Sequence, residues 1–231
     1  MKNIGIVGGL SPESTILYYK TIIEEYRRMF GDENYPSIII YSVNFGKFTE
    51  FMREGKRREA ADLLVKAVKS LQSAGADFAL IAANTPHMFF DYIASRSSIP
   101  LLSIIDALAE VLKRDNISKV GLLGTKFTLT QEFYVRGLKK HNIEAIIPEP
   151  NDIDTVNAII YGELVKGIFK EESRSKVVEI IKRLIRKGAK GVALACTELP
   201  LLISGTVDGT KLYDTAKIHA IKALKYAFED D

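Results

Sequence analysis

Lys2-Asn3-Ile4-Gly5-Ile6-Val7-Gly8, at the start of the chain, recurs as Ser118-Lys119-Val120-Gly121-Leu122-Leu123-Gly124 at an offset of 116 residues. A second match, at an offset of 113, takes Gly75-Ala76-Asp77-Phe78-Ala79-Leu80 to Gly188-Ala189-Lys190-Gly191-Val192-Ala193. Any two βα units share some likeness, which is the alternative explanation. Two offsets that differ by only three residues nevertheless favour an internal repeat of two similar lobes.

The chain between these matches alternates short apolar runs with longer amphipathic segments. Continuous apolar strands separated by helices indicate parallel strands covered on both faces, so we predict an α/β fold. Each lobe is expected to be a parallel sheet flanked by helices, with a pseudo-twofold relation between the lobes. The expected first lobe is 1–98 plus 210–231, and the second is 99–209. The predicted strands are 4–7, 37–41, 78–82, 120–123, 145–147 and 192–195, and the predicted helices are 12–30, 57–73, 105–114, 131–141, 154–165, 173–187 and 215–228.

Composition restricts the class of protein. The 231 residues include 32 Lys and Arg against 29 Asp and Glu, scattered through the predicted helices, so a nucleic-acid partner has no support. The single cysteine, Cys196, rules out an internal disulfide and a cysteine-based zinc site. No apolar stretch is long enough to span a membrane, and Met1-Lys2-Asn3 leads directly into a strand pattern. We therefore expect a cytoplasmic protein with no membrane partner.

The offset of 113 places Ala83 opposite Cys196, each directly after a predicted strand. Each is followed by polar residues, Asn84-Thr85 and Thr197-Glu198, which lead to a proline, Pro86 and Pro200. We call each of these two strand-to-helix connections a corner. A cysteine that opens a helix has backbone N–H groups near its sulfur, which favour the thiolate, the form that acts as nucleophile or base. An inert buried cysteine is the alternative reading of the same position.

The glycine-rich turn Gly8-Gly9-Leu10-Ser11 does not match a dinucleotide-binding fingerprint. It allows two readings: close approach of the Gly9 and Leu10 backbone to a small anion at a helix N-terminus, or simply a tight strand-to-helix turn. His87, His141 and His219 show no metal-ligand spacing, so no metal is expected. Among them, His87 follows the Asn84-Thr85-Pro86 corner and could line a pocket.

Five segments, in order along the chain, together resemble the aspartate/glutamate racemase family. They are Ile4 to Thr15 with Tyr18-Tyr19; Asn84-Thr85-Pro86-His87; Gly121 to Thr125 with Thr128 and Tyr134; Cys196-Thr197-Glu198; and Asp214-Thr215 with His219-Ala220.

The resemblance implies a cofactor-independent racemase in which two lobes enclose an acidic amino acid. In that family, cysteines face the α-carbon from opposite sides, because inversion requires a base on one face and an acid on the other. It further implies a homodimer that acts on aspartate or glutamate, with Cys196 as the base on the L side. The family's first corner reads Cys-Asn-Thr, whereas this chain has Ala83, at the position of the second acid/base.

Ala83 leaves several readings open. It is an engineered substitution, the mark of a natural one-base enzyme, or a sign that the protein has become a silent binder of acidic amino acids. A related isomerase of the hydantoin racemase or maleate isomerase type is a further alternative. We expect an isomerase that is impaired or one-sided.

Short polar groups at the carboxyl ends of strands are expected to hold the substrate's α-carboxylate and ammonium. These are Asn84, Thr85, Thr125, Thr128 and Thr197, with Glu198 and the backbone of Gly9 and Leu10 also assigned to the binding site. A dicarboxylic substrate needs a cation for its distal carboxylate, and Lys47, Arg53 and Lys166 are the candidates.

Overall fold

The computed structural model describes residues 1–229, which form two compact units. The first consists of residues 1–104 together with the C-terminal segment from His219, and the second of residues 105–218. Residues 230 and 231, the end of the expected first lobe, lie outside the described residues. Each unit has its own sheet with helices on both sides, which confirms the predicted α/β class.

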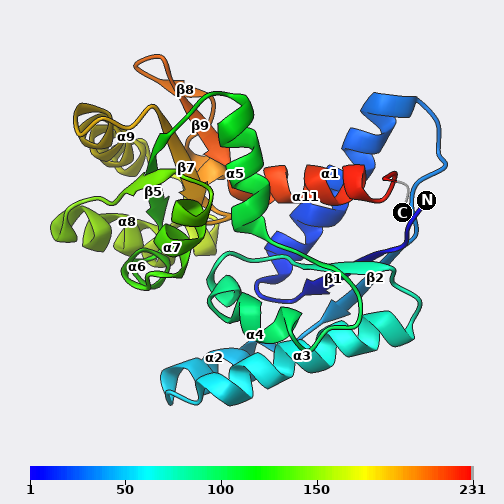
Figure 1. The fold of residues 1–231 in the computed structure, drawn as a ribbon. Helices are drawn as coiled ribbons and strands as arrows, with labels where there is room; N and C mark the ends of the chain where they lie inside the picture. The colour runs from blue at the N-terminus through cyan, green and yellow to red at the C-terminus, as the bar shows by residue number, and fades with distance from the viewer. Residues whose placement is uncertain (230–231) are drawn as a thin grey trace. The chain divides into compact units, whose positions relative to one another are not determined.

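The first unit is built on a four-stranded parallel sheet of order β2-β1-β3-β4. Figure 1 shows helices α1 and α3 on opposite faces of β1 and β2. Both faces of β1 and β3 are therefore buried. The strands are β1 (Ile4–Gly8), β2 (Ile38–Ser42), β3 (Phe78–Ile81) and β4 (Leu101–Leu102), and the helices are α1 (Pro12–Phe30), α2 (Phe45–Arg53), α3 (Arg57–Ser73), the 3-10 turn η1 (Thr85–Phe89) and α4 (Phe90–Ala94).

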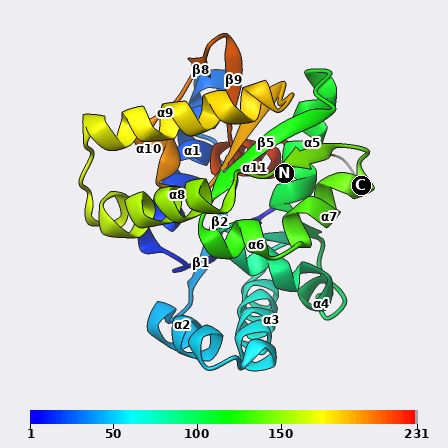
Figure 2. The ribbon, with the colours of Figure 1, turned by 90° about the vertical axis from the view of Figure 1, so that its left-hand side faces the viewer.

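The second unit has a five-stranded sheet of order β6-β5-β7-β9-β8, parallel except for the β8–β9 hairpin. Figure 2 shows α8 and α9 side by side next to β5, and Figure 1 shows α5 on the other side of β5 and β7. The strands are β5 (Lys119–Gly124), β6 (Glu144–Ile146), β7 (Gly191–Ala195), β8 (Thr206–Val207) and β9 (Thr210–Asp214), and the helices are α5 (Ile104–Arg114), α6 (Lys126–Thr130), α7 (Phe133–Lys140), α8 (Pro150–Gly162), η2 (Leu164–Lys166), α9 (Glu171–Arg186) and α10 (Leu199–Leu202). The last helix, α11 (Thr215–Tyr226), begins in the second unit and belongs to the first unit from His219 onward.

The two sheets share the connectivity that the repeat predicts. In each unit the first strand lies between the second and the third. The offset of 116 takes β1 onto β5, and the offset of 113 takes β3 onto β7. The two tyrosines related by the first offset, Tyr18 and Tyr134, are both fully buried. The repeat in the sequence therefore corresponds to two units with the same strand order and with equivalent buried positions.

The start of α1 follows from its sequence. Ser11 is the N-cap, and its hydroxyl accepts a hydrogen bond from the Ser14 N–H at 3.3 Å. Pro12 occupies the first turn, where no intrahelical donor is needed, and Gly31 ends the helix in the left-handed conformation. These signals place the N-terminus of α1 directly after β1, which brings Ser14 and Thr15 to the edge of the sheet.

Some elements differ from the sequence expectation. Helix α2 and the β8–β9 hairpin were not predicted, and α8 begins at Pro150, four residues before the expected start. Proline is favoured in the first turn of a helix, which explains that earlier start. Strand β9, assigned to the first lobe from the sequence, pairs with β7 and so belongs to the sheet of the second unit. In the described residues, no helix has both the length and the apolarity needed to cross a bilayer.

Candidate active site

In the second unit, two site residues follow neighbouring strands. Gly124 at the end of β5 is the register partner of Ala195 at the end of β7, so Thr125 and Cys196 emerge side by side at the carboxyl edge of the sheet. Thr125 caps α6: its hydroxyl accepts from the Thr128 N–H at 3.2 Å and lies 3.0 Å from the Thr128 hydroxyl. Both threonines are buried, so the structure brings three predicted site residues to one edge.

The Cys196 thiol is hydrogen-bonded within its own turn. Its Sγ donates to Oε2 of Glu198 at 3.0 Å, and the Thr197 hydroxyl donates to the same oxygen at 2.8 Å. Cys196 is 7% exposed, whereas Thr197 and Glu198 are half-buried. A single carboxylate oxygen is therefore in position to receive the thiol proton.

The expectation that this corner favours the thiolate is wrong for the structure described. Burial and the negative charge of Glu198 raise the pKa of the Cys196 thiol well above its ordinary value. The N–H groups of Glu198 and Leu199 lower this pKa, but their effect is smaller than that of burial and of the Glu198 charge. The protonated thiol is thus the resting form, and Glu198 is the adjacent proton acceptor.

Tyr161, near the end of α8, is a residue of this corner that the sequence analysis missed. Its pKa is raised by partial burial and by the negative charges that Cys196, once ionised, and Glu198 carry. Tyr161 remains 56% exposed. Nothing in its local sequence distinguishes it from a surface tyrosine.

In the first unit, the corresponding corner begins at Ala83 after β3. The Ala82 N–H donates to the Val7 carbonyl of β1, and the Ser14 hydroxyl donates to the Ala82 carbonyl at 2.5 Å. Nδ1 of His87 lies 2.8 Å from the Ala83 carbonyl. Asn84 is buried and Thr85 is half-buried at the start of η1. Hydrogen bonds thus fix the backbone of this corner at Ala82 and Ala83, but the side chain of its first residue, Ala83, is only a methyl group.

The glycine turn after β1 packs tightly. Gly9 has φ of 79°, and a Cβ at this position would lie 2.5 Å from the Val43 carbonyl oxygen. Its N–H donates to the Thr15 hydroxyl at 2.8 Å, so this donor is used within the turn. Leu10 next to it is 9% exposed. A tight strand-to-helix turn accounts for the glycine by itself.

The three candidate cations occupy exposed helical positions. Lys47 and Arg53 lie in α2, where the Lys47 ammonium sits 5.6 Å from the centre of the Phe51 ring. Lys166 ends η2 in the second unit, four residues after α8. No described hydrogen bond ties any of them to the Cys196 corner. Their role toward a distal carboxylate stays a prediction.

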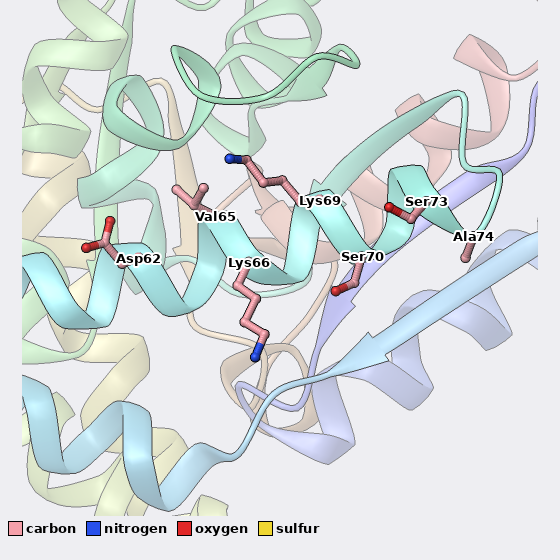
Figure 3. A pocket seen from close by; sticks show the side chains of 7 residues that line it. All are labelled: Asp62, Val65, Lys66, Lys69, Ser70, Ser73 and Ala74. Atoms are coloured by element: carbon pink, nitrogen blue, oxygen red, sulfur yellow. The ribbon is translucent and has the colours of Figure 1, made fainter.

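A surface hollow along α3 contains none of the predicted site residues. It is lined by Asp62, Val65, Lys66, Lys69, Ser70, Ser73 and Ala74. Figure 3 shows Lys66 and Lys69 leaving the helix in different directions, so their charges do not converge on one point. This hollow offers no arrangement for holding a ligand, and the strand-to-helix corners remain the candidate site.

Comparison with known proteins identifies the protein family of this chain. The sequence pattern of the Asp/Glu/Hydantoin racemase family matches residues 7–223. The chain therefore belongs to the Asp/Glu/hydantoin racemase family.

Particular relatives support the same placement. The chain is 27% identical over 216 residues to the broad specificity amino-acid racemase RacX of Bacillus subtilis (strain 168), covering 92% of each chain. A structure from Yersinia pestis, described as a candidate Asp/Glu racemase, is 40% identical with a TM-score of 0.95, covering 99% of this chain and all of that one. An aspartate racemase homologue from Pyrococcus horikoshii OT3 is also 40% identical, with a TM-score of 0.89 and the same coverage.

Proposed function

We propose that this protein acts on aspartate or glutamate by removing and returning the α-proton of the L-enantiomer, with Cys196 as the base. The observation that carries the proposal is the 3.0 Å hydrogen bond from Cys196 Sγ to Glu198 Oε2 at the carboxyl end of β7. Family membership supplies the reaction class, and this pair supplies a thiol with a proton acceptor beside it.

The proposed step is a proton relay. The Glu198 carboxylate takes the Cys196 proton, and the resulting thiolate takes the α-proton of the substrate, leaving a carbanion stabilised as an enolate. The hydroxyls of Thr125, Thr128 and Thr197 are proposed to bind the α-carboxylate or the ammonium and to stabilise the negative charge. Return of a proton from Cys196 to the same face regenerates the L-acid. In heavy water the thiol exchanges its proton for a deuteron from solvent while the enolate persists, so this cycle incorporates deuterium without inversion.

With Ala83 in place, inversion of the α-carbon is expected to be slow. A methyl group carries no transferable proton, so reprotonation on the other face would depend on water. We therefore propose one-sided or impaired racemase activity. Tyr161 is proposed as a further substrate contact, because the residue is partly exposed and its pKa responds to the charges of Glu198 and of an ionised Cys196.

The test is α-proton exchange in heavy water with each enantiomer of aspartate and glutamate, followed by mass spectrometry and chiral chromatography. We expect deuterium in L-aspartate or L-glutamate with little D-product, and loss of exchange in Cys196→Ser. Undiminished exchange in that variant would remove Cys196 from the mechanism. The control variant is Ser204→Ala, on the exposed segment after α10, which is expected to keep the wild-type rate.

Other outcomes separate the alternatives. Tight binding of an acidic amino acid with no exchange would indicate a silent binder. Turnover of a hydantoin or of maleate, with none of aspartate or glutamate, would indicate a related isomerase, and the family description itself includes hydantoin racemases. The homodimer implied by the family resemblance stays a prediction, and light scattering of the purified chain tests it.

A further inference from the structure

Two buried histidines of the first unit are outside the proton relay proposed above. His87 is 3% exposed in η1, and His219, in α11, is fully buried. Their rings lie 5.7 Å apart, edge to face. In both residues each ring nitrogen has a hydrogen-bond partner, so both side chains connect polar groups inside the core.

The partners of His87 determine which nitrogen carries its proton. The Ile104 backbone N–H, which can only donate, points at Nε2 at 3.1 Å. The Ala83 carbonyl, which can only accept, faces Nδ1 at 2.8 Å. His87 must therefore be neutral with its proton on Nδ1.

His219 has the opposite arrangement. Its Nε2 lies 3.1 Å from the Leu102 carbonyl, which can only accept, so Nε2 carries the proton. Its Nδ1 then accepts from the Tyr18 hydroxyl at 2.9 Å. Two neutral histidines with different tautomers thus sit side by side.

The segments tied by these bonds are the ones that leave and re-enter the unit. Leu102 and Ile104 are the last stretch before the chain passes into the second unit, and His219 is where it returns. Through His87, that stretch is also connected to the carbonyl of Ala83, the first residue of the corner. No local sequence signal marks this connection, because its members come from four separate elements.

We propose that His87 and His219, both neutral and each in one tautomer, form a bridge of hydrogen bonds and ring contact. This bridge holds the backbone of the Ala83 corner in a fixed position against Leu102–Ile104 and α11. His87 and His219 are accordingly positioning residues: they act through the backbone of the corner and contact no reacting atom. Their function is to keep residue 83 and Asn84 at a fixed place, whatever side chain residue 83 carries.

The direct test is nitrogen NMR of the full chain labelled with ¹⁵N-histidine at neutral pH. The chain has three histidines, and His141→Gln assigns and removes the third, whose ring pairs with Asp106 on the surface. We expect His87 to be protonated only on Nδ1 and His219 only on Nε2. The other tautomer, or an imidazolium, at either residue would overturn the bridge.

Two variants separate the two hydrogen bonds of His87, one to the Ile104 N–H and one to the Ala83 carbonyl. A glutamine places its amide near the position of Nε2, so His87→Gln keeps an acceptor for the Ile104 N–H and loses the bond to Ala83. An asparagine reaches only the position of Nδ1, so His87→Asn keeps the bond to Ala83 and loses the acceptor. We expect the Ile104 amide to exchange with solvent roughly tenfold faster in His87→Asn than in His87→Gln. Equal rates would contradict the assignment.

A catalytic readout rests on the proposed function. In an Ala83→Cys background, His87→Gln should lower kcat for inversion with little change in KM, and His87→Asn should retain more of kcat. Equal losses in the two variants would show that His87 does not position the corner. If Ala83→Cys alone gives no inversion, the proposed role of residue 83 as the position of the second acid/base fails, and the NMR and amide-exchange results still decide the bridge.

Discussion

The sulfur of Cys196 and the carboxylate of Glu198 are joined by a 3.0 Å hydrogen bond within one turn of chain. The Thr197 hydroxyl donates to the same carboxylate oxygen, which orients it toward the thiol. Because the carboxylate is beside the sulfur, it opposes formation of a thiolate at rest and yet is the nearest group that can take the thiol proton. The corner is therefore a coupled acid–base pair.

Glu198→Gln should have opposite effects on the acidity of Cys196 and on catalysis. Removal of the negative charge lowers the pKa of the Cys196 thiol, which the ultraviolet absorbance of the thiolate measures against pH. Loss of the proton acceptor should slow α-proton exchange by about 10²-fold. Thr197→Val, which keeps the carboxylate and removes only its second donor, should have a smaller effect on both. An unchanged exchange rate in Glu198→Gln would exclude Glu198 as the acceptor.

Ala83→Cys should raise inversion of acidic amino acids in both directions by orders of magnitude, because in the proposed mechanism it supplies the second acid/base group. Chiral chromatography over time with L- and D-aspartate and glutamate measures this. Ala83→Ser, which adds a group of similar size but much weaker acidity, is the matched control and should gain far less. Cys196→Ala in the Ala83→Cys background should abolish inversion. A folded Ala83→Cys protein with unchanged inversion on every acidic substrate would disprove the proposal that residue 83 occupies the position of the second acid/base.

Stability should fall as the pH is lowered through about 6.5, the ordinary pKa of histidine. Burial and the neighbouring His87 hold the pKa of His219 well below that value, so His219 stays neutral in the folded chain. The titratable groups that face it are His87 from η1 and the Tyr18 hydroxyl from α1. Below about pH 6.5 the unfolded chain binds a proton that the folded chain does not. The free energy of unfolding then drops by up to about 1.4 kcal/mol per pH unit.

Urea unfolding of the wild type and of His219→Gln, between about pH 7 and pH 5, checks this contribution. His219→Gln is expected to start less stable and to lose less stability over that range. Parallel pH profiles for the two proteins would contradict a neutral buried His219. Carboxylates titrate mainly at lower pH and are common to both proteins, so the comparison isolates the imidazole.

Gly9→Ala should destabilise the fold much more than Gly31→Ala. Both glycines have positive φ, 79° and 73°, so an alanine is strained at either position. A Cβ at Gly9 would also meet the Val43 carbonyl at 2.5 Å, whereas at Gly31 nothing lies within 4 Å. We expect losses of about 1 kcal/mol for Gly31→Ala and more than about 2 kcal/mol for Gly9→Ala from denaturant unfolding. Similar losses would mean that the turn after β1 relaxes around the new methyl group.

The sequence was sufficient for the class of fold and for the position of both corners. Apolar strands and amphipathic helices are local patterns, and the offsets of 116 and 113 relate β1 to β5 and β3 to β7. A corner is also local, since Cys196, Thr197 and Glu198 are consecutive. Elements with weak local patterns were missed: α2 presents only Phe48 as a buried residue, and β8 has two residues.

The protonation states of the site were decided only by the tertiary structure. Local sequence favoured a thiolate at Cys196, but its pKa depends on burial and on which carboxylate oxygen faces the sulfur. Likewise, the tautomers of His87 and His219 follow from backbone groups of Ile104 and Leu102 that only folding brings to them. Strand and helix patterns arise from neighbours along the chain, whereas desolvation and hydrogen-bond partners arise from neighbours in space, which is why the sequence located the groups and the folded chain determined their charge.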